Sequence, residues 1–112
     1  MFIRSSRTGK AYWIGNISRT RPRGGSPRYP LVIAELDEKK LALRAETVTI
    51  IDDRGPDDSS DMQLSNFSFL EDLKTGHILV SLYRDQGRGS WGVHSKNPGV
   101  DGLQTYEIEV RK

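Results

Sequence analysis

The chain has 112 residues, no cysteine and a formal net charge of +2 at pH 7. This length suits a single domain, residues 1–112, with one modest hydrophobic core. The lack of cysteine excludes disulfides and thiolate metal sites. No segment approaches the roughly 18 consecutive apolar residues that span a bilayer, and the first residues lack the apolar stretch of a secretory signal. We therefore expect a soluble protein, cytoplasmic by default, that has no membrane partner.

The charges are unevenly distributed along the chain. Residues 1–29 contain seven Lys/Arg and no Asp/Glu, whereas the remaining residues contain ten against fifteen. A basic segment can bind nucleic acid, an anionic surface or a ligand carboxylate, because each offers negative charge to arginine. A solvated basic loop beside an acidic body has the same composition, so both interpretations stay open.

Runs of β-branched and aromatic residues, bounded by Gly, Pro and Asp, predict strands in chain order at 11–18, 31–37, 47–52, 64–70, 78–84 and 105–111. Residues 38–46 are the best helix candidate, but they are few and lie between two strong strands. Residues 74–76 (Lys-Thr-Gly) predict a tight hairpin turn, and a longer Gly-rich connection at 85–102 precedes the last strand. We therefore predict an all-β protein of antiparallel sheets with little or no helix.

The strands fall into two similar units, 9–53 and 62–112. Residues 9–14 resemble 76–81, since in each a turn glycine leads into a strand, and residues 31–36 match 105–110 about 70 positions apart. The run 31–34 is apolar at consecutive positions and needs cover on both faces, whereas Tyr106, Ile108 and Val110 alternate with charged residues. Such a mixture fits stacked blades of a β-propeller better than a two-sheet sandwich.

Segments 12–17, 26–37, 47–54, 64–72 and 77–83 carry a resemblance to a known family. They are similar to the sialidase-like (BNR-type) six-bladed β-propeller proteins, a glycoside hydrolase family. The resemblance spans roughly residues 9–84 and covers the C-terminal two blades only. It implies a partial propeller related to carbohydrate binding.

In that family three arginines bind the substrate carboxylate, a tyrosine with a neighbouring glutamate is the nucleophile, and an aspartate is the acid/base. Arg28 matches one carboxylate-binding arginine, whose planar fork suits a carboxylate. Leu64 stands where the nucleophilic tyrosine is expected, so the resemblance implies incomplete catalytic machinery. The candidate ligand contacts, with no catalytic residue, metal or cofactor assigned, are Asn16, Arg28, Ser65, Asn66 and Trp91.

Each of these residues has a plainer alternative. Arg28 could pair with acidic residues across a unit boundary, Ser65 and Asn66 could cap the entry to a strand, and Trp91 could fill a gap between sheets. Residues 87–92 match G-x-G-x-x-G, but no helix is predicted after them to receive a pyrophosphate. The acidic stretch 52–61 lacks the spacing of a calcium loop and is interpreted as a solvated acidic turn. The two histidines have no metal-ligand spacing.

Two other function classes remain. One is a small basic β-barrel that binds nucleic acid, with Tyr12 and Trp13 as stacking platforms and cations at Arg4, Arg7, Lys10, Arg19, Arg21 and Arg23. The other is a structural or interaction module. Because two blades cannot close a ring, we also expect self-association, as a homo-dimer or a homo-trimer that completes a propeller.

Overall fold

The computed structural model describes residues 1–21, 27–58, 62–85 and 102–111. These residues form two open antiparallel sheets and a single short 3-10 helix, η1 (Ala45–Thr47). The predicted all-β class with little helix is confirmed. Among the described residues, no helix is long and apolar enough to cross a membrane.

The first sheet is a meander in the order β1-β2-β3, and its far edge is shared by two short strands. Both β4 and β5 pair with β3, at opposite ends of it. The sheet therefore has four strand positions, with bounds β1 (Phe2–Arg4), β2 (Ala11–Asn16), β3 (Leu31–Asp37), β4 (Ala42–Leu43) and β5 (Thr49–Asp52).

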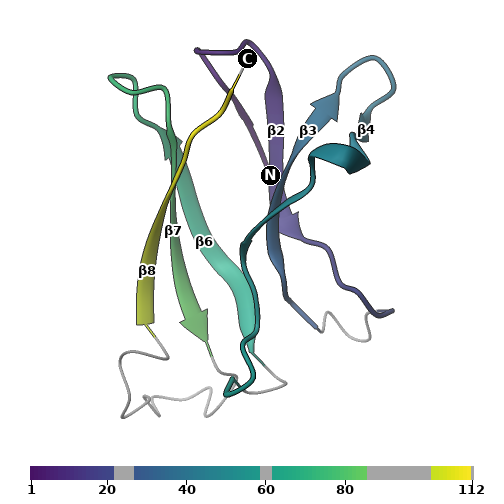
Figure 1. Cartoon of the computed structure of the whole chain (residues 1–112), viewed down its shortest axis with the longest axis vertical. Coiled ribbons are helices and arrows are strands. Elements are labelled where there is room, and N and C mark those ends of the chain that lie inside the picture. The colour runs from purple at the N-terminus through teal and green to yellow at the C-terminus, as the bar shows by residue number, and fades with distance from the viewer. Residues whose placement is uncertain (22–26, 59–61, 86–101, 112) are drawn as a thin grey trace.

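The second sheet is a three-stranded meander in the order β6-β7-β8. Its strands are β6 (Gln63–Glu71), β7 (Ile78–Asp85) and β8 (Gly102–Ile108). Figure 1 shows this sheet on the left, facing the first sheet on the right, with β8 at the outer edge.

All six predicted strands exist, with shifts at their ends. The last strand covers Gly102–Ile108 instead of 105–111, although Val110 beyond it is still buried. Strands β1 and β4 were not predicted. The alternative of a small β-barrel is wrong, because both sheets are open within the described part of the chain.

The hydrophobic core lies between the two sheets. Alternate residues of each strand point inward, and the buried cluster consists of Tyr12, Ile14, Leu31, Ile33, Met62, Leu64, Ile78, Val80, Leu82 and Val110. Residues 31–34 are all buried, as their apolar run predicted. On the outer face of the first sheet, the Trp13 ring lies so close to Gly15 that a Cβ there would overlap it.

The β1–β2 and β6–β7 hairpins have the same turn. The amide of Ser5 donates to the Lys10 carbonyl (2.9 Å) and that of Asp72 to the His77 carbonyl (2.8 Å). Each turn ends in a Thr-Gly pair whose glycine has positive φ, Gly9 at 74° and Gly76 at 75°. Strands β1, β2 and β3 therefore correspond to β6, β7 and β8. The strand registers align residues 31–36 with 103–108, two residues away from the match with 105–110 that the sequence indicated.

The two turns also contact each other and join the sheets at one end. The amide and hydroxyl of Ser6 donate to Glu71 at 2.7 and 2.8 Å, and Arg7 donates to the Thr75 carbonyl at 3.1 Å. The opposite end carries the polar residues of the candidate site.

Candidate functional site

An open hollow of about 340 Å³ lies on the outer face of the β6-β7-β8 sheet. Asn66 of β6 is paired with Tyr83 of β7, which is in turn paired with Leu103 of β8. The Tyr83 side chain is 42% exposed, so its ring is available to a ligand. The full lining is Asn66, Phe67, Ser68, Ser81, Tyr83 and Leu103. The hollow thus combines the exposed Tyr83 ring with an amide and two hydroxyls, and Phe67 and Leu103 complete its lining.

A second group of predicted residues meets where β6 begins. Arg28 forms an isolated bridge with Gln63, and the Leu64 amide donates to the Arg28 carbonyl (2.9 Å). Nη1 of Arg28 donates to Oγ of Ser65 at 3.4 Å. The half-buried Arg28 is therefore held beside Ser65 by backbone as well as side-chain contacts.

Asn16 connects the same region to the first sheet. Its Nδ2 donates to the carbonyls of Pro30 (3.3 Å) and Leu64 (3.2 Å). One bond thus fixes the end of β2 to the residue before β3, and the other joins β2 to β6. Both amide hydrogens have a structural role, and Oδ1 is the atom left for a ligand.

The structure thus divides the predicted set. Asn16, Arg28 and Ser65 lie together at the junction of the sheets, whereas Asn66 lines the outer hollow. Trp91 lies outside the described residues. Leu64, which the resemblance aligned with a nucleophilic tyrosine, is fully buried in the core.

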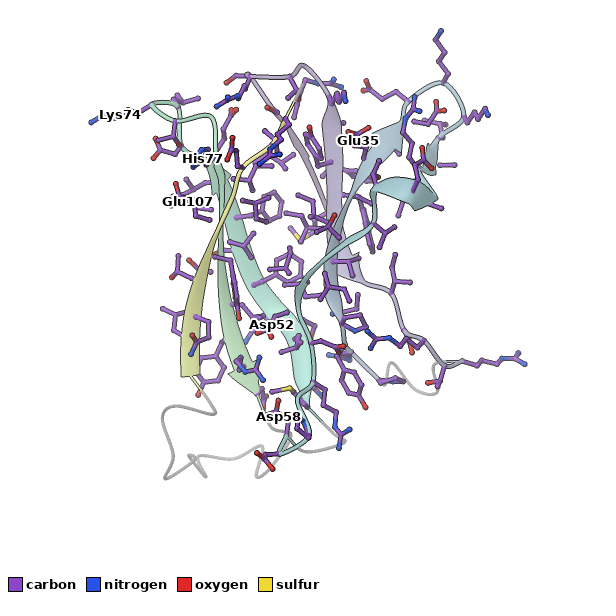
Figure 2. All side chains as sticks on the ribbon, viewed as in Figure 1. Glu35, Asp52, Asp58, Lys74, His77 and Glu107 are labelled. Atoms are coloured by element: carbon purple, nitrogen blue, oxygen red, sulfur yellow. The ribbon has the colours of Figure 1, made fainter. Side chains whose placement is uncertain are left out.

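A buried polar cluster that the sequence did not predict lies beside this junction. Arg84 of β7 donates through Nη1 to Asp52 and through Nη2 to Asp58 (2.7 Å). All three side chains are nearly buried, with 13%, 14% and 8% of their surface exposed. Asp58 also accepts the amide of Gly55 at 2.7 Å. Figure 2 shows Asp52 between the two sheets and Asp58 on the loop below it.

Tyr106 of β8 completes this cluster by donating its hydroxyl to Asp52. Burial, and then the hydrogen bond to Asp52, raise the pKa of Tyr106 to about 12. Burial opposes the charge of Arg84, but the two aspartates outweigh it and raise the pKa of the guanidinium. The phenol therefore stays neutral at physiological pH, which is the opposite of nucleophile activation.

The cluster carries no sequence signal beyond its charges. Asp52 and Asp58 belong to a stretch that was interpreted as a solvated acidic turn, and that interpretation is wrong for these two residues. Groups of three or more His, Cys, Asp or Glu that could hold a metal ion are absent from the described residues. At the other end of the sheet, His77 contacts a single carboxylate, that of Glu107 (Figure 2).

Several of the residues named for nucleic-acid binding make contacts within the fold. Tyr12 is only 6% exposed and so cannot stack on a base, and Trp13 is half-buried beside Gly15. Ion pairs hold three of the named cations, Arg4 to Glu38, Lys10 to Glu35 and Arg19 to Asp53. Arg23 lies outside the described residues.

Comparison with protein-family models, curated proteins and solved structures finds no match to this chain. Inferences about function therefore rest on the geometry of the two polar regions and on the hollow.

Proposed function

We propose that this chain is a carbohydrate-binding module, without catalytic machinery of its own, built from two blade-like units of the sialidase-like propeller type. The observation that carries the binding proposal is the hollow around Tyr83. The CH-rich face of a sugar ring packs on an exposed aromatic ring, while its hydroxyls bond to amides and hydroxyls placed around that ring. Asn66, Ser68 and Ser81 supply such groups beside Tyr83.

The blade-like interpretation is supported by the repeated topology. Two meanders with the same hairpin turn pack face to face around one core, and each buries its inward side chains against the other. Successive propeller blades pack in the same manner.

Two observations support the absence of catalysis. Leu64 is a fully buried core residue at the position where the family has its tyrosine. The tyrosine that does lie beside a carboxylate, Tyr106, has its pKa raised to about 12 and so keeps its proton. Neither residue offers a nucleophile to an anomeric carbon.

Arg28 lies at the sheet junction and outside the lining of the hollow, so it gives the proposal a second, separate contact, one that suits an acidic sugar unit. Its guanidinium lies 3.4 Å from Ser65 Oγ, and an arginine carries five N–H donors that suit a carboxylate together with a neighbouring hydroxyl. Acidic glycans would then bind more tightly than neutral glycans of the same size.

Binding to a panel of neutral and acidic oligosaccharides tests these proposals. Tyr83→Ala should abolish glycan binding, whereas Leu70→Ala, which removes an exposed side chain that does not line the hollow, should leave it intact. Arg28→Gln should remove only the preference for acidic glycans. Binding that survives in Tyr83→Ala would contradict the hollow as the site.

Salt separates this proposal from nucleic-acid binding. Contacts with phosphates release counterions, so affinity for an oligonucleotide falls steeply as salt rises. Binding of a neutral glycan to the Tyr83 hollow should change little over the same range. A steep fall, together with loss of binding in Arg21→Gln, would favour the nucleic-acid alternative.

A further inference from the structure

Strand β8 is the edge strand of its sheet, whereas the corresponding strand of the first sheet has further strands paired beyond it. Its counterpart β3 pairs on its far edge with β4 and β5. Among the described residues, no strand pairs with the far edge of β8. The repeat within this chain therefore identifies that edge as a position at which a further strand fits.

The hairpin geometry fixes which backbone groups of β8 point to this edge. The Asp72 amide donates to the His77 carbonyl. The amide and carbonyl groups of His77 and of every second residue after it are therefore directed toward β6. The backbone groups of the residues between them are directed toward β8. These residues are Ile78, Val80 and Leu82, which pair with Ile108, Tyr106 and Gln104. The amide and carbonyl groups of Leu103, Thr105 and Glu107 consequently point outward.

The first sheet supports this assignment. The turn glycines Gly9 and Gly76 align Tyr12 with Leu79, each three residues further along. Tyr12 pairs with Glu35 and Leu79 pairs with Glu107, so Glu35 corresponds to Glu107. The Glu35 carbonyl accepts the Arg44 amide beside β4 at 2.9 Å, and its amide donates to Thr47 Oγ1 at 2.8 Å. Both backbone groups of Glu35 therefore point to the far edge of the sheet. Ile33 and Leu31 lie two and four residues before Glu35, so their backbone groups point the same way.

Strand β8 is self-complementary about its midpoint. It spans Gly102–Ile108, so its central residue is Thr105, one of the outward-pointing residues. An antiparallel pair of β8 strands centred there opposes Thr105 to Thr105, Leu103 to Glu107 and Gln104 to Tyr106. The strand holds one charged residue and no Lys or Pro, so within residues 102–108 no like charges face each other and no residue type that hinders pairing is present.

We propose that two copies of this chain associate through β8, antiparallel about a two-fold axis at Thr105, so that their three-stranded sheets become one continuous sheet. The dimer edge borders the glycan hollow, because Leu103 of β8 lines that hollow, whereas Thr105 at the axis does not. Variants at Thr105 therefore test the association without changing a residue of the hollow.

Cross-linking tests the axis directly, because the chain has no cysteine. Residues in a hydrogen-bonded antiparallel pair have Cα atoms about 5.5 Å apart, a separation that a disulfide can bridge. Thr105→Cys should oxidise to a covalent dimer in dilute solution. Leu103→Cys, whose cysteine would face the partner subunit's Glu107, should cross-link poorly alone but readily when mixed with Glu107→Cys.

Sedimentation equilibrium tests the association without cross-links. The native chain should sediment as twice 12.6 kDa. Thr105→Lys places two like charges at the axis and should raise the dimer dissociation constant at least about tenfold, whereas Thr105→Val should keep it. Circular dichroism checks that each variant is folded. A native monomer at high concentration, or a dimer that Thr105→Lys and Thr105→Cys leave unaffected, would overturn the proposal.

Discussion

The phenol of Tyr106 in β8 donates a hydrogen bond to Asp52 at the end of β5, so this bond joins the two sheets through their buried interior. Asp52 accepts at the same oxygen from Arg84 of β7. One carboxylate thus binds two strands of the opposite sheet.

Stability should fall in alkaline solution because of Tyr106. Its pKa is raised from 10 to about 12 in the folded state, so below pH 10 the phenol is neutral in both states and its contribution to stability is complete. As pH rises from 10 through about 12, the unfolded chain loses its proton first and this contribution is lost. Urea unfolding across this range should show a steeper decline for the native chain than for Tyr106→Phe.

The matched control for that measurement is Tyr83→Phe, which removes an exposed phenol on the outer face. It should keep the native pH dependence. If the free energy of unfolding of Tyr106→Phe instead fell as steeply with pH as that of the native chain, the bond to Asp52 would not link stability to pH.

Removal of Arg84 should be strongly destabilising. Arg84→Leu would leave Asp52 and Asp58 nearly buried without this cation, and breaking a buried ion pair from one side costs about 3 kcal/mol or more. Chemical denaturation measures the loss. The additional change Asp52→Asn should recover part of it by removing one buried charge, and a loss of less than about 0.5 kcal/mol in Arg84→Leu would indicate a solvated surface pair.

Gly15→Ala should destabilise the first sheet because of Trp13. A Cβ at position 15 would overlap the indole ring, and overpacking of this kind costs about 1–3 kcal/mol. Thermal unfolding of the variant measures the cost. The same substitution in a Trp13→Leu background should cost much less, and equal costs in both backgrounds would contradict the contact.

Both matching turns should be destabilised by loss of their glycines, the β6–β7 turn more than the β1–β2 turn. Gly9 and Gly76 have positive φ, where a Cβ costs about 1–2 kcal/mol, and asparagine tolerates this region better than alanine. Gly9→Ala should therefore unfold at lower denaturant than Gly9→Asn. Gly76→Ala should lose more of the free energy of unfolding than Gly9→Ala, because its Cβ would also lie 3.0 Å from the Arg7 side chain.

Strands with strong local patterns could be predicted from the sequence, and those held by neighbours could not. The run 31–34 and the alternation at Tyr106 and Ile108 identify their strands because burial dictates the residue types. Phe2–Arg4 and Ala42–Leu43 are too short to show alternation, and each exists because an adjacent strand offers it hydrogen bonds. Even so, the Thr-Gly pair shared by both turns was a usable signal for β1.

The candidate site was predictable only where contacts follow the chain closely. Ser65 and Asn66 were identified together, but the alternation of a strand places one beside Arg28 and the other in the outer hollow. Tyr83 was not singled out, since an aromatic residue in a strand is usually a core residue. The pairing of Arg84 with Asp52 and Asp58 joins distant segments, and the sequence holds many arginines and aspartates that could have made it.

The placement of the inter-sheet bonds has a consequence for how the chain folds. Each meander is made of strands close in sequence and can form its own ladder early, whereas the bonds of Ser6 to Glu71 and of Asp52 to Tyr106 connect residues 65 and 54 positions apart. These long-range bonds require both sheets to have docked. The ultraviolet absorbance of Tyr106 therefore offers a kinetic marker for docking, separate from the circular dichroism signal that follows strand formation.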